Sequence, residues 1–465
     1  MNEQTKVNPL GTLPVQKLLH QFAVPSIIAM IVSALYNIVD QFFIGRAVGE
    51  LGNAATNIAF PLSISCIAIA LLFGIGGASA FNLAMGQGKK EEAANYVGNA
   101  ITLLLGCGTV LLIITQLFLT PLLRLFGSPD NVLGYATVYT RITSFGFPFL
   151  IVATGAGNVI RADGSPKFSM TCNLVGAVIN TVLDAIFVFG FDMGMAGAAY
   201  ATIIGQIVSG LMALYYLRHY KTVQLRKENF LLKGKCVSKI ASLGASPCIN
   251  QVSMMIVQII MNKSLTHYGA LSVYGASVPL ACAGIITKIN QFYFSVVVGI
   301  SQGLQPIVSY NYGAKKYDRV KKACTLACLY GLGISIIAFI AFFFFPRPII
   351  SIFGNGSDAY FDFAVMYFRV FLFFTFLNFT QPIISNFFTA IGKPRIGVFL
   401  SLTRQILFLL PLVVILPTFM GIDGLLYAGP IADGLAGVIC IFMVFKEFKK
   451  KEYHMAESKT TEQAA

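Results

Sequence analysis

The sequence predicts an all-α polytopic membrane protein, with twelve transmembrane helices in two six-helix bundles related by pseudo-two-fold symmetry. Three features lead to this prediction: the composition, a recurrence of long apolar runs, and an internal repeat. Hydrophobic residues make up 56% of the 465 residues and charged residues only 11%, whereas soluble domains carry roughly 25% charged residues. A soluble fold cannot bury so many apolar side chains, so we expect the chain to lie in a lipid bilayer.

Each apolar run is close to the ~20 residues that an α-helix needs to cross ~30 Å of hydrocarbon. Gly and Pro, 43 and 18 residues in all, are scattered through these runs. This suits membrane helices, because neighbouring helices re-satisfy a broken backbone and small residues permit close packing. The expected spans are residues 18–44, 51–83, 95–120, 133–160, 168–190, 194–217, 240–266, 272–309, 318–345, 360–391, 396–417 and 422–445.

The basic residues sort by side of the membrane. They concentrate at both termini and in alternate loops, most densely over residues 218–239, while the other loops hold only Arg46, Arg124 and Arg347. The positive-inside rule therefore predicts a cell-membrane protein with both termini in the cytoplasm. The basic residues that orient the chain in the membrane also account for its net charge of +14. We therefore expect no nucleic-acid partner.

Comparison of the chain with itself reveals a repeat with an offset of 227 or 228 residues. Six helices are expected in each copy, and a repeat with an even number of spans keeps its orientation, as in transporters built from parallel repeats. Such halves can rock about a central cavity. The matching pairs are Phe126-Gly127 with Phe353-Gly354, Tyr139 with Tyr367, Arg141 with Arg369, Asn158 with Asn386, and Gly164-x-Pro166 with Gly392-x-Pro394.

The repeat and the charges divide the chain into four parts. We expect an N-terminal lobe over residues 1–217, a basic cytoplasmic linker over 218–239 and a C-terminal lobe over 240–445. Residues 446–465 are charged and poor in apolar side chains, which predicts a disordered cytoplasmic tail. Residues 1–17 lack the short apolar region and cleavage pattern of a signal peptide, so no processing is expected.

No motif for covalent or metal chemistry stands out in the sequence. The chain has no Walker motif, no Ser/His/Asp set and no Cys or His cluster with metal-binding spacing, although it contains nine cysteines. We therefore expect neither enzyme activity nor a cofactor, and an ion gradient as the source of energy. We also expect a monomer.

Three acidic residues, Asp40, Asp184 and Asp433, fall within the expected spans. A charge at the bilayer centre costs at least ~2.5 kcal/mol, so something must offset each one. Asn180 lies four residues before Asp184, on the same face of a helix. The expected topology also places Asp40, Asp184 and Thr202 at similar depths, roughly 8 to 12 Å below the outer surface. Three helices thus bring oxygen atoms to one level.

Asp40, Asn180, Asp184 and Thr202 form the predicted ion-coupling site. Their carboxylate, amide and hydroxyl oxygens suit a hard cation such as Na⁺. Alternatively, two carboxylates held close together share a proton, which makes them a proton carrier. A third possibility is that the two aspartates only hydrogen-bond between helices and stabilise the packing.

Aromatic and amide side chains near this level are candidates for lining a substrate cavity. Tyr36 and Asn37 lie about one helical turn before Asp40, and Tyr139 and Asn158 are further candidates. An aromatic face attracts an organic cation through its negative quadrupole. The tyrosine rings are therefore candidates for stacking on a cationic aromatic substrate.

A second polar group is expected in the C-terminal lobe. Asp433 shares the membrane with Lys288 and Arg404. An ion pair is the simplest reading of this C-lobe polar network. A role in substrate binding is the alternative.

The loop motifs "GQGKKEEA" after the second span and "RADGSPK" after the fourth, with an acidic residue late in the first span, resemble the multidrug and toxic compound extrusion (MATE) transporters. The resemblance covers almost the whole chain and is closest to the branch with aspartates in the first and fifth spans. It implies a V-shaped pair of bundles that exports organic cations in exchange for Na⁺ or H⁺. It also implies an ion site in the N-terminal lobe, whose residues match Asp40, Asn180, Asp184 and Thr202.

The C-terminal lobe departs from this pattern, which predicts that one lobe alone binds the ion. Where the N-terminal lobe has two aspartates and a threonine, the C-terminal lobe has Asn262, Leu412 and Gly429.

The predicted function is secondary active export of organic, chiefly cationic, drugs or toxic compounds across the bilayer in exchange for Na⁺ or H⁺. A flippase for lipid-linked saccharides is the alternative of related architecture. An anionic head group would favour cations in the N-terminal lobe, where this sequence places acids. A channel or a receptor is a further alternative, although duplicated lobes favour rocking over a fixed pore.

Overall fold

The computed structural model describes residues 8–275, 277–351, 358–450, 452 and 453. Over these residues every regular element is helical and strands are absent, which confirms the predicted all-α class. The first half contains η1 (Pro9–Gly11), α1 (Val15–Val48), α2 (Glu50–Gly86), α3 (Lys90–Leu117), α4 (Leu119–Leu125), α5 (Asp130–Ser144), α6 (Phe147–Ala162), α7 (Pro166–Asp184), η2 (Ala185–Gly190) and α8 (Gly194–Leu217). After η3 (Lys227–Phe230), the second half contains α9 (Gly234–Ala270), α10 (Ser277–Gly313), α11 (Tyr317–Phe344), α12 (Pro346–Ser351), α13 (Asp358–Met366), η4 (Tyr367–Phe371), η5 (Phe373–Leu377), α14 (Thr380–Ala390), α15 (Pro394–Leu402), η6 (Thr403–Leu409), α16 (Leu410–Met420) and α17 (Ile422–Phe448).

Eleven helical stretches in the described residues are long and apolar enough to cross a membrane, and the pair α5 and α6 supplies a twelfth span. The two helices of this pair meet at a bend of 55°. Pro148 lies in the first turn of α6. Because proline lacks a backbone N–H and its ring clashes with the preceding turn, α5 cannot continue straight into α6. The twelve predicted spans are confirmed, and the chain is a multi-pass membrane protein.

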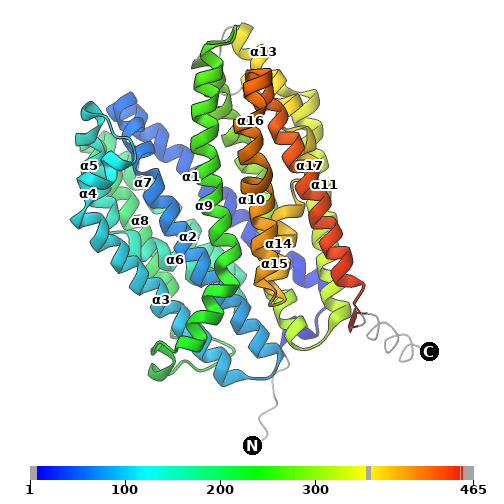
Figure 1. Ribbon diagram of the computed structural model, residues 1–465. Helices are drawn as coiled ribbons and strands as arrows, with labels where there is room; N and C mark the ends of the chain where they lie inside the picture. The colour runs from blue at the N-terminus through cyan, green and yellow to red at the C-terminus, as the bar shows by residue number, and fades with distance from the viewer. Residues whose placement is uncertain (1–7, 276, 352–357, 451, 454–465) are drawn as a thin grey trace, which may run out of the picture.

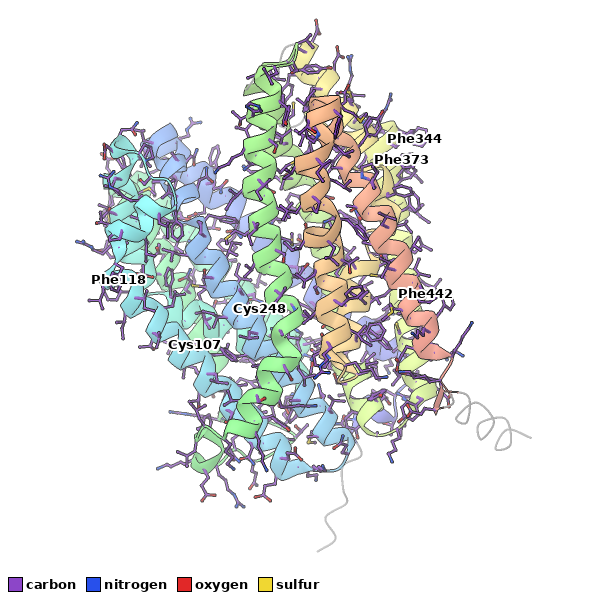
Figure 2. The ribbon with its side chains drawn as sticks, in the orientation of Figure 1. Cys107, Phe118, Cys248, Phe344, Phe373 and Phe442 are labelled. Carbon is purple, nitrogen blue, oxygen red and sulfur yellow. The ribbon has the colours of Figure 1, made fainter. Side chains whose placement is uncertain are left out.

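The helices form two bundles, α1 to α8 in one and α9 to α17 in the other (Figure 1). We call them the N-bundle and the C-bundle. The start of α1 and the end of α17 lie at the same end of the molecule, where α9 also begins, and we call this the linker end. Figure 2 shows Phe118 at the outer edge of the N-bundle, and Phe344 and Phe442 at the outer edge of the C-bundle. All three side chains are more than half exposed, as expected for side chains that contact lipid tails.

Each bundle contributes the first turns of its first helix to the core of the other bundle. Leu18 and Phe22 of α1 are buried in the apolar cluster formed mainly by C-bundle side chains. Ile240 and Leu243 of α9 are buried in the apolar cluster of the N-bundle. This reciprocal exchange follows the internal repeat and joins the bundles at the linker end.

Glycines permit the closest approach between the bundles. A Cβ atom on Gly244 of α9 would lie 1.7 Å from the carbonyl oxygen of Leu72 in α2. A Cβ atom on Gly303 of α10 would lie 2.6 Å from the Cα atom of Ala23 in α1. Both distances are far below van der Waals contact, so the two helix pairs can cross here only because these residues carry no side chain.

Polar contacts between the bundles cluster at the same end. They also involve the backbone just before and at the start of α1, which C-bundle side chains hold in place. The contacts are Gln305 Nε2 to Ser79 Oγ (2.8 Å), Asn311 Nδ2 to the Leu10 carbonyl (2.9 Å), Lys316 Nζ to the Gly11 carbonyl (2.8 Å), Arg319 Nη2 to the Leu13 carbonyl (2.5 Å) and His20 Nε2 with Tyr330 Oη (2.9 Å).

We expect Gly244→Ala to destabilise the protein, because its methyl group must displace the backbone of α2. Overpacking of this kind typically costs about 1–3 kcal/mol. Thermal unfolding of the detergent-solubilised protein can be followed with a thiol-reactive dye, because all nine cysteines are free and most are buried. The matched control is Gly333→Ala on α11, where the added methyl meets no atom within 4 Å. Equal unfolding temperatures for the two variants would contradict the proposed role of Gly244.

Candidate functional site

Two carboxylates meet inside the N-bundle. Asp40, on α1, is 9% exposed and Asp184, the last residue of α7, is fully buried. Asp184 and Thr202 are close neighbours of the Asp40 carboxylate. The Oδ1 atoms of both aspartates are buried without a hydrogen-bond partner among the described residues. A carboxylate pair in this arrangement can receive a positive particle between its oxygens.

No cation of the described chain offsets these two acids. The described Lys and Arg residues that form ion pairs do so with other carboxylates. The electrostatic neighbours of the two aspartates are one another, Thr202 and the tyrosines Tyr36 and Tyr139. A buried charge without a partner costs several kcal/mol, so a cation or a proton must neutralise at least part of this site.

Asn180 connects the pair to α8. In the amide orientation that satisfies both neighbours, its Nδ2 donates to Asp184 Oδ2 and its Oδ1 accepts from the backbone N–H of Thr202, both at 3.2 Å. Small residues make this possible, because a Cβ atom on Gly205 would lie 2.7 Å from the Gly176 carbonyl oxygen. The close packing of α7 on α8 brings Thr202 to the level of the aspartates, as the sequence predicts.

The helix changes its winding directly after Asp184. Residues Ala185–Gly190 form a π-helical segment, η2. In the C-bundle, Arg404 also lies in a π-helical segment, η6. π-helical turns are rare in proteins overall, and those that occur are often found at functional sites. Asp184 and Arg404 therefore both lie at π-helical irregularities, one in each bundle.

Two adjoining pockets lie beside the carboxylate pair. Tyr36 and Asn180 line one pocket and Tyr139 lines the other, while Thr202 and Gln206 line both. The Gln206 Oε1 atom is buried and has no hydrogen-bond partner among the described residues. It is therefore free to accept a hydrogen bond from a ligand or a water molecule in these pockets.

Gln206 is a site residue that the sequence analysis missed. It follows Thr202 by four residues, so both side chains lie on one face of α8. This four-residue spacing could have identified Gln206 from the sequence. It was overlooked because Gln206 is uncharged and the search within the spans centred on acidic residues.

The structure places two other candidates away from the pockets. Asn37 is exposed on α1 and donates to the carbonyl of Ser33 at 2.7 Å. Asn158 is buried in α6, where it accepts a hydrogen bond from Arg161 Nη2 at 2.6 Å. Arg161 also donates to Ser169 Oγ at 3.1 Å. Asn158 thus contacts a buried guanidinium group instead of the aspartates.

The predicted C-lobe polar network is an ion pair between Arg404 and Asp433, with Lys288 separate from it. Arg404 Nε donates to Asp433 Oδ1 at 2.5 Å, and the two side chains are 13% and 1% exposed. Lys288 is exposed on α10 and forms no ion pair among the described residues. The second oxygen of Asp433 is buried without a partner in the described part of the chain.

A duplicated twelve-span fold, with an uncompensated carboxylate pair in one bundle, is typical of a membrane transporter. The MatE family model matches residues 25–186 and again residues 247–415, one match in each half. The chain belongs to the MATE (MatE) family.

Known proteins resemble the chain over nearly its whole length. The "Multidrug export protein MepA" of Staphylococcus aureus (strain MSSA476) is 23% identical over 435 residues, which cover 93% of this chain and 94% of the relative. The corresponding protein of Staphylococcus saprophyticus is 23% identical over 427 residues, 91% of this chain and 92% of the relative. A solved structure of the "MATE multidrug transporter DinF-BH" is 33% identical, has a TM-score of 0.88 and covers 98% of this chain and 100% of that chain.

Proposed function

We propose that this protein is an ion-coupled exporter of organic, chiefly cationic, compounds, driven by inward movement of Na⁺ or H⁺. The observation that carries the proposal is the buried pair Asp40 and Asp184, which lacks a cation partner within the described chain. The names of the relatives support multidrug export, since MepA is a multidrug export protein and DinF-BH a multidrug transporter.

The coupling ion binds at Asp40, Asn180, Asp184 and Thr202. Four oxygen-bearing side chains suit Na⁺, which prefers hard ligands, and the carboxylate pair also suits a proton. Binding of Na⁺ or of a proton neutralises negative charge on the two aspartates, where α1 meets α7. A ligand shifts a conformational equilibrium only through its differential affinity for the two states. The ion must therefore bind more tightly in one of the two arrangements of the bundles.

We further propose that this arrangement of the bundles faces outward, with the positive-inside rule setting the orientation. The contacts between the bundles cluster at the linker end, which is the end rich in Lys and Arg and hence the cytoplasmic end. Export then requires these contacts to open and the opposite end to close.

Tyr36, Tyr139 and Gln206 provide the substrate contacts in the N-bundle. The two rings can stack on a flat organic cation, and Gln206 Oε1 can accept a hydrogen bond from it. The nearby carboxylates complement its positive charge. The ion and the substrate therefore compete for the same negative potential, which is a direct way to couple entry of one to release of the other.

Transport in proteoliposomes tests this proposal. A fluorescent organic cation is loaded, and Na⁺ and pH gradients are imposed separately, each with the membrane potential clamped. We expect saturable efflux under at least one gradient. A conductance under voltage without counterflow would indicate a channel. Movement of lipid-linked saccharide without drug efflux would indicate a flippase, although the acids of the N-bundle do not favour an anionic head group.

A further inference from the structure

The linker between the bundles is fixed against α3 by hydrogen bonds to its backbone. Around η3 the chain has little regular structure, yet the carbonyl groups of three consecutive residues and one nearby N–H are paired with α3 side chains. The hydrogen bonds run from Asn99 Nδ2 to the carbonyls of Asn229 and Leu231 (3.0 Å each), from Thr102 Oγ1 to the carbonyl of Phe230 (2.8 Å) and from Lys233 N to Asn99 Oδ1 (2.8 Å).

The sequence of α3 places this segment at the expected boundary between water and hydrocarbon. Asn99 is nine residues beyond Lys90, the first residue of α3, or about 13 Å along the helix axis. The apolar stretch of α3, residues 100–117, begins directly after it. A backbone in contact with lipid must have its polar groups paired within the protein. Asn99 and Thr102 pair the backbone of the linker in this way.

Two leucines of the same segment point away from the protein. Leu231 and Leu232 are 66% and 56% exposed, although the backbone on either side of them is held in place. Phe230, the preceding residue, turns inward and packs on the N-bundle core. A rigid pair of exposed leucines at the level of the membrane surface is suited to insertion between lipid chains.

Basic side chains surround the leucines. Over residues 226–239 there are five cations and one acid, Glu228. All five cations are exposed, and Lys233 Nζ donates to Asn95 Oδ1 at 2.9 Å. The cations are Arg226, Lys227, Lys233, Lys235 and Lys239.

We propose that residues 226–239 form a binding site for anionic phospholipid, in which Leu231 and Leu232 enter the acyl region and the lysines contact the phosphate head groups. Each lysine near an anionic surface contributes about a fivefold preference for the charged lipid. Lys239 lies five residues into α9, and its long side chain can extend back to the head groups while its methylenes contact lipid.

The lipid site also holds the junction between the bundles. Ile240 and Leu243, which follow the lysines on α9, are buried in the N-bundle core. Lipid bound at the linker thus stabilises the docking of α9 onto the N-bundle, in the region where the bundles touch most closely. This anchoring does not depend on what the chain transports.

The sequence contains no tryptophan, so Leu231→Trp introduces a single fluorescent reporter at the site. The full-length variant is reconstituted in phosphatidylcholine vesicles that contain a minority of phosphatidylglycerol, with brominated acyl chains on one lipid or the other. Bromine quenches tryptophan on contact. We expect phosphatidylglycerol to quench about twofold or more beyond its share of the bilayer, since the lysines concentrate it locally.

Two comparisons make the experiment decisive. In the Leu231→Trp background, the combined changes Lys227→Gln, Lys235→Gln and Lys239→Gln should clearly lower the preference for phosphatidylglycerol. Arg226 and Lys233, which are kept, account for any preference that remains. Leu125→Trp is the matched control, because Leu125 is 77% exposed and its neighbour Arg124 is already paired with Asp130. It should show no lipid preference in either background.

The proposal is overturned if the tryptophan at position 231 shows no preference, if the triple lysine replacement leaves its preference unchanged, or if aqueous iodide quenches it and bromolipid does not. Thiol-dye unfolding of each variant verifies that it is folded. Quenching requires no cargo, so a negative result would leave the proposed export function unaffected.

Discussion

Asp40→Asn and Asp184→Asn should each reduce gradient-driven efflux of an organic cation to the level of empty liposomes. The two carboxylates face each other without a cation of the described chain, so an amide at either position removes half of the negative charge that attracts the coupling ion. An amide can neither accept a proton at neutral pH nor bind Na⁺ with a full charge. Efflux from proteoliposomes under imposed Na⁺ and pH gradients measures the loss.

The matched control is Asp423→Asn, an exposed carboxylate in the first turn of α17. This change should leave efflux intact. Unfolding of Asp40→Asn and Asp184→Asn should occur at or above the temperature of the unmodified protein, since each change removes an uncompensated buried charge. Full efflux by either site variant would show that the pair serves only packing.

Asp433→Leu should destabilise the protein by about 3–5 kcal/mol, because it leaves the Arg404 guanidinium group buried without its partner. Replacing both residues, Arg404→Leu with Asp433→Leu, should recover most of the loss, since apolar pairs of similar volume often equal buried ion pairs in stability. Thiol-dye unfolding of the unmodified protein and of the two solubilised variants measures both changes in stability.

The control for this series is Asp362→Leu. Asp362 pairs with Arg347 at 2.8 Å, but both side chains are about 60% exposed, and such pairs contribute about 0–1 kcal/mol. Efflux by the double variant then separates the two roles left open for Asp433. Retained efflux indicates a structural ion pair, and efflux lost from a stable double variant indicates a contact with substrate.

Helix periodicity and the expected depth in the membrane were enough to predict the four residues of the ion site from the sequence. Asn180 precedes Asp184 by one turn, and the expected topology put Asp40 and Thr202 at the same level, so the structure finds all four together. The same reasoning could not predict that Asn37 is exposed and bonded to its own helix, or that Arg161 is the partner of Asn158. If a helix is rotated about its axis by the angle between two consecutive residues, different side chains face the interior of the bundle. Sequence patterns do not determine this rotation precisely enough.

The polar group of the C-terminal half shows the same limit. The sequence predicted a network of Lys288, Arg404 and Asp433, and the structure pairs only Arg404 with Asp433. Both cations lie within the membrane, so depth alone could not decide between them. The packing of η6 against α17 decided it.

By itself, the sequence determined the membrane class, the twelve spans and their duplication. These follow from the length of apolar runs and from the recurrence of motifs, which are properties of short stretches of chain. The tertiary structure alone showed that α1 and α9 exchange their first turns between the bundles, that Gln206 lines the two pockets beside Thr202 and that α3 fixes the linker backbone. Each of these depends on contacts between residues far apart in the chain, which only the packing of whole helices decides.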